Sequence, residues 1–135
     1  MITREADYAI RSLLLLSEFK QSDKLATTLS ISEDIEVPYR FLRKILLRLK
    51  DAGFVKTKKG KNGGLILAKQ ESEISVYDIL QAISQTSLAF SLCTGTGKKE
   101  CHRKGFCNTH SHFEKIQIIL DNELKKLTLA KLAAK

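Results

Sequence analysis

The sequence predicts a mostly α-helical protein with a small β-hairpin wing: a winged helix-turn-helix followed by a long C-terminal dimerisation helix. Three observations predict this class. Two short segments with helical apolar spacing are joined by a tight turn, a basic hairpin sequence follows at once, and a longer amphipathic segment lies near the end of the chain. The 135 residues are enough for one domain with an added helix.

The first predicted helix runs from Thr3 to about Lys20. Thr3 can cap this helix, and Glu5 lies in its first turn, where a carboxylate interacts favourably with the helix dipole. The apolar residues on its core side are Ala6, Ile10, Leu13 and Leu14.

A helix-turn-helix is predicted next. Residues 29–35 form its first short helix, with Thr28 as a possible N-cap, or with the Ser30-x-x-Glu33 capping box as an alternative start. The turn falls at Glu36-Val37, and two short helices joined in this way are typical of DNA-binding proteins.

The second helix of this pair opens at Val37-Pro38, because proline suits the first helical position, and it ends at Gly53 as a left-handed cap. Its apolar face comprises Phe41, Leu42, Ile45, Leu46 and Leu49. The stretch FVKTKKGKNGGLILAK then changes to strand character around a Lys-Gly-Lys-Asn-Gly-Gly turn. An Asn-Gly-Gly turn between such runs predicts a β-hairpin, placed as a wing.

The positive charge is concentrated in this part of the chain. Between Glu36 and Lys69 there are ten basic and two acidic residues, and ten minus two equals the formal net charge of +8. A basic helix followed by a basic hairpin predicts binding to double-stranded DNA, with base reading by the early recognition helix and phosphate contacts from lysine and arginine. The predicted contacts are Thr28, Pro38, Tyr39, Arg40, Arg43, Lys44, Arg48, Lys58, Lys59 and Lys61.

The remaining chain is predicted as a short helix over 76–84, a loop over 87–109 and a longer helix over 110–127. An a/d stripe on the last helix, interrupted at Glu123, predicts that it joins two copies of the chain; it comprises Phe113, Ile116, Leu120 and Leu127. We therefore divide the chain into a DNA-binding domain (1–86), a cysteine-rich loop (87–109) and a dimerisation helix with a C-terminal tail (110–135).

The loop carries every cysteine of the chain, in the pattern Cys93-x7-Cys101-x5-Cys107-x2-His110. Soft thiolate ligands spread over a loop favour an iron–sulfur cluster, either 2Fe-2S or 4Fe-4S. Such a cluster usually needs four protein ligands, so one is missing from the cysteine count. His110 and Asp7 are both candidates for the fourth.

The cysteines could also be inert thiols, zinc ligands or redox-active thiols without iron. Inert buried thiols normally have apolar neighbours, which these lack, and zinc sites normally show cysteine pairs at close spacing, which are missing here. A regulator that uses thiols or zinc without iron is the main alternative. A protein that uses its cluster for electron transfer would leave the basic segment without a role.

Several classes are not expected. There is no phosphate-binding loop and no nucleophile elbow, so we do not expect an enzyme. The longest apolar run, residues 13–16, is too short to span a bilayer, and the polar start is unlike a secretory signal. We therefore expect a cytoplasmic chain with reduced thiols.

The sequence resembles the bacterial winged-helix iron–sulfur transcription regulators, the IscR- and NsrR-like family. The resemblance rests on DYAIRSLLLL, VPYRFLRKILLRLKDAGFVKTKKGKNGGLIL, ISVYDILQAI, the three cysteines and the closing LTLAKL. It implies a dimeric regulator, a repressor, whose cluster governs DNA binding in response to iron–sulfur status, redox state or nitric oxide. It also implies that the cysteines hold the cluster with His110, as in IscR-like members, or with Asp7 across the dimer, as in NsrR-like members.

Two positions depart from the family's pattern. Arg43 stands where IscR-like proteins have an acidic residue that tunes DNA specificity, and Lys59 stands where the wing has an arginine that enters the minor groove. The resemblance therefore does not imply the IscR operator for this chain.

Overall fold

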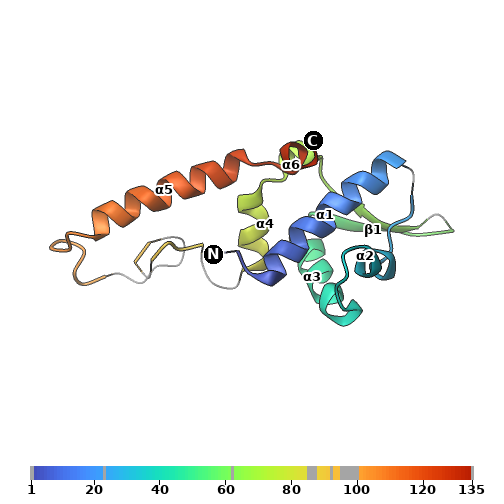
Figure 1. Cartoon of the computed structure of the whole chain (residues 1–135), viewed down its shortest axis with the longest axis horizontal. Helices are drawn as coiled ribbons and strands as arrows, with labels where there is room; N and C mark the ends of the chain where they lie inside the picture. The colour runs from blue at the N-terminus through green and yellow to red at the C-terminus, as the bar shows by residue number, and fades with distance from the viewer. Residues whose placement is uncertain are drawn as a thin grey trace.

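The computed structural model describes residues 2–22, 24–61, 63–84, 88–91, 93–94 and 101–134. The chain forms a helical body with a two-stranded hairpin, from which one long helix projects (Figure 1). Its elements are α1 (Arg4–Ser22), α2 (Thr28–Asp34), α3 (Tyr39–Asp51), β1 (Val55–Lys58), β2 (Gly64–Leu67), the 3-10 turn η1 (Glu71–Glu73), α4 (Val76–Ile83), α5 (His110–Lys126) and α6 (Leu129–Ala133). The predicted class is confirmed. Within the described residues, no helix is long and apolar enough to cross a bilayer.

The start of α2 corrects both predicted caps. Neither Thr28, which is the first helical residue, nor the Ser30-x-x-Glu33 box caps the helix. The cap is Thr27, whose backbone is extended and whose hydroxyl accepts from the Ser30 N–H at 3.0 Å. The Ser30 hydroxyl in turn accepts from the Thr27 N–H at 2.9 Å, which completes a reciprocal box three residues before the predicted box and one residue before the predicted Thr28 cap.

The turn and ends of α3 follow from backbone geometry. Glu36 has φ 55, a left-handed conformation that reverses the chain between α2 and α3. Pro38 is the N-cap rather than the first helical residue, because its ψ of 131 is extended while its carbonyl already accepts from the α3 backbone. At the other end Gly53 has φ 81, as predicted, and its N–H bonds to the Lys50 carbonyl at 3.0 Å while the Phe54 N–H bonds to the Leu49 carbonyl at 2.9 Å.

The predicted hairpin is confirmed as an antiparallel pair in which Val55 lies opposite Leu67 and Lys58 opposite Gly64. The start of β2 is anchored on the α1–α2 connection, where the Leu65 N–H donates to the Ala26 carbonyl at 2.7 Å. A Cβ at Gly64 would lie 2.6 Å from the same carbonyl oxygen, so this close approach requires glycine. Asn62, in the predicted turn, lies outside the described residues.

The C-terminal segment returns to the helical body, which the sequence analysis did not predict. The Leu129 N–H donates to the Ile74 carbonyl and the Val76 N–H donates to the Leu127 carbonyl, each at 2.8 Å. These bonds bring α6 against α1 and η1, and the Leu129 side chain is fully buried in the core. The end of α5 is thereby tied to the start of α4. The division of the chain into the three parts 1–86, 87–109 and 110–135 stays a prediction.

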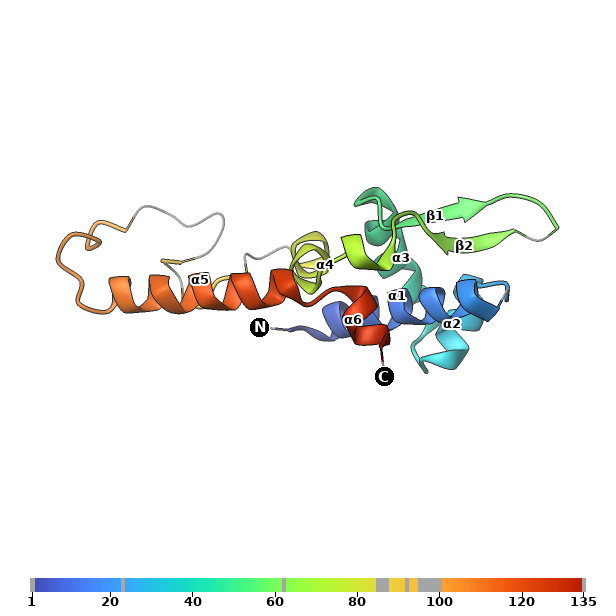
Figure 2. The same ribbon diagram turned by 90° about the horizontal axis from the view of Figure 1, so that it is seen from above.

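The molecule is elongated. The hairpin tip and α2 lie at one end, and α5 runs toward the other end with the cysteine loop beside it (Figure 2). The described residues of that loop, 88–91, 93–94 and 101–109, form no helix or strand, as predicted. Within one chain the cysteines are therefore remote from the wing.

Candidate DNA interface and cysteine site

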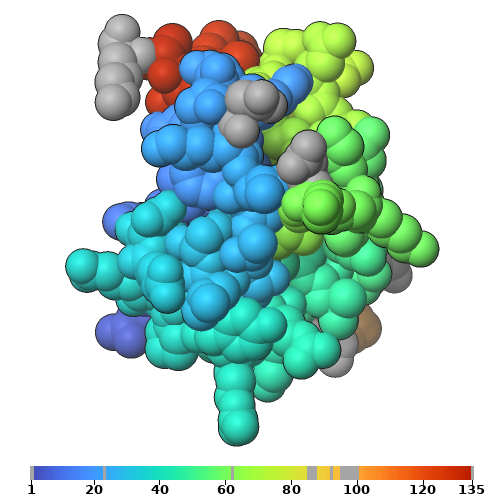
Figure 3. Space-filling view, turned by 90° about the vertical axis from the view of Figure 1, so that its right-hand side faces the viewer, coloured from blue at the N-terminus to red at the C-terminus, as the bar shows by residue number. Residues whose placement is uncertain are grey.

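The predicted recognition helix presents a basic face to solvent. Its apolar side, Leu42, Ile45, Leu46 and Leu49, is buried in the core. This orientation leaves the predicted contacts of its first two turns exposed: Pro38, Tyr39, Arg40, Arg43 and Lys44. Figure 3 looks onto this end of the molecule, where α2 and α3 lie beside the hairpin.

The wing adds a second basic surface. Lys58, Lys59 and Lys61 are exposed around its tip, and Gly60 has φ 111 in the turn between them. Thr28, in the first turn of α2, is half-buried. Elongated duplex DNA could lie across α3 and reach the wing, since both are at the same end of the molecule.

Arg48 differs from the other predicted DNA contacts. Its guanidinium donates to a Glu5 carboxylate oxygen at 2.9 Å and to the Ile83 carbonyl at 3.2 Å. It therefore joins α3 to α1 and α4, and its side chain is only 35% exposed. We therefore do not propose Arg48 as a phosphate contact.

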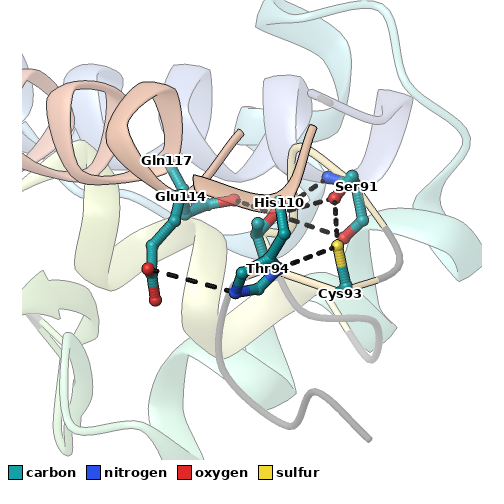
Figure 4. Close-up of polar contacts among 6 residues, drawn as sticks. All are labelled: Ser91, Cys93, Thr94, His110, Glu114 and Gln117. Carbon is teal, nitrogen blue, oxygen red and sulfur yellow. Dashed lines mark hydrogen bonds and ion pairs between the residues drawn. The ribbon is translucent and has the colours of Figure 1, made fainter. Parts of the chain in front are cut away.

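Two predicted cluster ligands meet where the loop reaches the start of α5. The Cys93 Sγ lies 3.4 Å from the His110 Nδ1 (Figure 4). A thiolate and an imidazole on one tetrahedral metal ion lie roughly 3.6 Å apart, so this pair fits adjacent ligands. The His110 side chain is buried, and its Nε2 has no hydrogen-bond partner among the described residues, the Glu114 carboxylate lying 4.0 Å away.

The other two cysteines are not gathered with this pair. The Cys107 Sγ lies 3.1 Å from the Thr109 Oγ1, and hydrogen bonds from the Thr109 hydroxyl and backbone, and then from the His110 backbone, lower the pKa of this thiol. Cys101 lies in a turn in which its carbonyl accepts from the Lys104 N–H at 3.0 Å. In the part of the chain that the structure describes, no three metal-ligating side chains form one group.

Asp7, the alternative fourth ligand, lies on α1. It forms an ion pair with Arg11 at 2.9 Å and is about half-exposed. A half-exposed carboxylate on α1 is accessible to a second chain. The family resemblance implies that Asp7 would complete the cluster of such a second chain.

Sequence reasoning missed the residue that attaches the loop to α5. Gln117 is buried on the long helix, with its side-chain amide hydrogen-bonded to Leu88, Phe90, Thr94 and Asp121. The sequence did contain a signal for this role, because Gln117 is an amide between two isoleucines of the helix. An amide is buried only where its hydrogen bonds are made, so its position indicated a partner elsewhere in the fold.

The exposed face of α5 is strongly apolar. Ile118 is 55% exposed and Ile119 is 63% exposed, and the predicted stripe residues Ile116, Leu120 and Leu127 are also exposed. Phe113 differs from the rest of the predicted stripe, because its ring packs edge-on against Phe90 of the cysteine loop at 5.3 Å between centroids.

Comparison with known proteins assigns the architecture. A family model described as "Rrf2: Iron-dependent Transcriptional regulator" matches residues 2–135. The chain is 26% identical over 133 residues to the HTH-type transcriptional repressor NsrR of Streptomyces coelicolor. This alignment covers 98% of this chain and 88% of that relative.

Solved structures give the same result. The T. potens IscR structure aligns with a TM-score of 0.76 and 25% identity, over 98% of this chain and 85% of that one. The Bacillus subtilis global cysteine regulator CymR has the same fold, with a TM-score of 0.76 and 18% identity over 99% and 96% of the two chains.

The names of these relatives confirm the expectation of a transcription regulator rather than an enzyme. The family match extends over nearly the whole chain and includes both the basic winged helix and the cysteine loop. This chain belongs to the Rrf2 family of transcriptional regulators.

Proposed function

We propose that this chain is a cytoplasmic repressor that binds promoter DNA as a homodimer under the control of an iron–sulfur cluster. The observation that carries the cluster assignment is the contact between Cys93 and His110, with the second ring nitrogen of that histidine buried and without a hydrogen-bond partner among the described residues. The signal would be iron–sulfur status, redox state or nitric oxide.

The DNA contacts in this proposal are those that the fold leaves free. Tyr39, Arg40, Arg43 and Lys44 would enter the major groove, while Lys58, Lys59 and Lys61 would contact phosphates or the minor groove. Pro38 and Thr28 would approach the backbone at the helix N-termini. Because much of the affinity would come from released counterions, binding should weaken steeply with salt.

The homodimer is supported by the apolar face of α5. Ile116, Ile119 and Leu120 are exposed in a single chain and lie on one face of the helix by their spacing, with Ile118 exposed beside them, and exposed apolar residues grouped in this way mark an interaction surface. Pairing two copies along this helix would cover the patch and present two recognition helices to two half-sites.

The cluster would be held by Cys93, Cys101, Cys107 and either His110 or Asp7. When bound, it would supply redox and ligand-exchange chemistry that the side chains lack. The protein's part is to keep Cys93 at His110 and to let the segment with the other cysteines close around the site.

A physical connection from the loop to the DNA-binding body runs through α5. The loop is attached to this helix by Gln117, and the helix ends in backbone hydrogen bonds that tie Leu127 to Val76 and Leu129 to Ile74. A change in the loop would therefore shift α5, and with it the spacing of the two recognition helices in the dimer.

The test is an absorption spectrum with iron and sulfide analysis of protein purified without oxygen. We expect a brown protein with matching iron and sulfide. His110→Ala and Asp7→Ala then assign the fourth ligand, with His112→Ala as the matched control because His112 is exposed on the same helix. A colourless protein after reconstitution with iron and sulfide would contradict the cluster.

A second candidate is a thiol-based or zinc-based regulator of the same fold. The observation that favours it is the hydrogen bond between Thr109 and the Cys107 thiol, whose lowered pKa increases the thiolate fraction. Such a protein would be colourless, and Cys107→Ser would remove its response to oxidants while DNA binding in reducing buffer stays unchanged.

A further inference from the structure

We propose that Gln117 is a positioning residue that fixes the Cys93 segment on α5 and so keeps this thiol at His110 in the metal-free protein. The inference deepens the proposed function, because it concerns the same cysteine site. It assigns to the dimer helix itself the task of preparing half of that site.

The Gln117 amide makes use of both its oxygen and its nitrogen. Its Oε1 accepts from the Phe90 N–H and, at 3.1 Å, from the Thr94 hydroxyl. Its Nε2 donates to the Leu88 carbonyl at 2.7 Å and to the Asp121 Oδ1 at 2.8 Å. Three of these four bonds reach the loop, and they span residues 88–94.

The loop forms a small hydrogen-bonded turn next to this amide. Thr94 is buried, and its hydroxyl oxygen accepts from the Ser91 N–H at 3.0 Å, which closes a small turn around Cys93. The Thr94 N–H returns to the Ser91 carbonyl at 3.2 Å, and the Ser91 hydroxyl lies 3.3 Å from the Cys93 Sγ. Figure 4 shows Ser91, Cys93 and Thr94 beside the start of α5, with the Cys93 thiol directed toward the His110 ring.

Burial makes this attachment sensitive to the side chain at position 117. The Gln117 residue is 4% exposed. An amide in such a position is costly unless its hydrogen bonds are made, and removing it leaves backbone groups of the loop without partners. A leucine of similar size would fill the space but could not hold the loop.

The same helix carries the dimer face. Gln117 lies between Ile116 and Ile118, whose side chains are exposed, so the loop and the second chain would contact adjacent positions of α5. The position of the Cys93 segment and the packing of the dimer are therefore linked through one helix.

The experiment uses metal-free full-length protein and two nuclear magnetic resonance measurements. In Gln117→Leu we expect amide hydrogen exchange at Phe90 to accelerate at least about tenfold, because its acceptor is gone, with exchange in α1 and α3 unchanged. Asn122→Leu, an exposed change on the same helix, is the matched control and should leave Phe90 exchange as in the wild type.

The second measurement reports the Cys93–His110 contact directly. Replacing Cys93 by serine should shift the His110 ring signals in the wild type, and should shift them much less in Gln117→Leu. Thr94→Val should weaken the attachment in the same direction and Thr94→Ser should preserve it, so the inference can still be tested if Gln117→Leu does not fold.

Unchanged Phe90 exchange and an unchanged His110 response in both Gln117→Leu and Thr94→Val would overturn the inference. Because both measurements are made without metal, a wild-type protein that never binds iron would overturn the cluster proposal and leave this test intact. After reconstitution, we expect Gln117→Leu to retain less iron than Asn122→Leu.

Discussion

Two arginines on α3, five positions apart, should affect different properties when replaced by alanine: one DNA binding and the other stability. Arg43 is exposed on the basic face, whereas Arg48 bonds to Glu5 and to the Ile83 carbonyl. We expect Arg43→Ala to weaken DNA binding without loss of stability. We expect Arg48→Ala to lower the free energy of unfolding without changing the salt dependence of DNA binding.

The magnitudes follow from these surroundings. The Arg48–Glu5 pair is partly exposed, so screening limits it to at most about 1 kcal/mol, and the bond to the Ile83 carbonyl adds about 1 kcal/mol. The total of roughly 1–2 kcal/mol should lower the urea midpoint by roughly 0.5–1 M. For Arg43, a lost charged contact in each half of the proposed dimer should cost about tenfold to a hundredfold in affinity and reduce the salt slope by about 2.

Urea unfolding followed by circular dichroism gives the stabilities. Fluorescence anisotropy with operator DNA at several salt concentrations gives the affinities and slopes. If Arg48→Ala reduced the salt slope as much as Arg43→Ala while keeping wild-type stability, the internal role of Arg48 would be refuted. A stable Arg43→Ala protein with unchanged DNA affinity would refute the assignment of the basic face.

The other predictions concern the fold around this interface. Leu129→Ala should cost about 2–5 kcal/mol in urea unfolding, because the side chain is fully buried although it lies near the C-terminus; wild-type stability would show that α6 is not part of the core. Gly64→Ala should cost about 1–3 kcal/mol and weaken DNA binding, since the added Cβ meets the Ala26 carbonyl, whereas Gly105→Ala, with open space around it, should do neither. Hydrogen bonds, first from its own backbone, lower the pKa of Glu71, so its contribution to stability is present above pH 4.5 and is lost as the pH falls through the lower folded value. Glu71→Gln should therefore lose less stability than the wild type over that acidic range, and equal acid sensitivity of the two proteins would contradict this.

Local sequence signals were sufficient for the helix-turn-helix and its wing. Apolar spacing placed α3, and Gly53 ended it, because only glycine readily adopts the left-handed backbone found there. The errors were shifts of one to three residues at the caps. Thr27 and Thr28 both carry a hydroxyl. Only the backbone conformation decides which of them caps the helix by accepting a free N–H of its first turn.

The roles of charged and polar side chains were less predictable. Arg48 follows the same basic pattern as Arg43, but its partners come from α1 and α4, which no local pattern brings next to it. Gln117 likewise gains its function from loop residues more than twenty positions away in sequence. Composition indicates that such groups exist, whereas their hydrogen-bond partners depend on the folded chain.

The sequence by itself determined the fold class, the basic winged helix and the pattern of three cysteines with His110, because each is a local run of residues with its own periodicity or spacing. Only the tertiary structure decided that α6 returns to the core, that Cys93 meets His110, and that α5 carries the loop on one side and an exposed apolar face on the other. The physical reason is that buried area and hydrogen bonds between distant segments form only when the whole chain is compact, so no short stretch of sequence contains them.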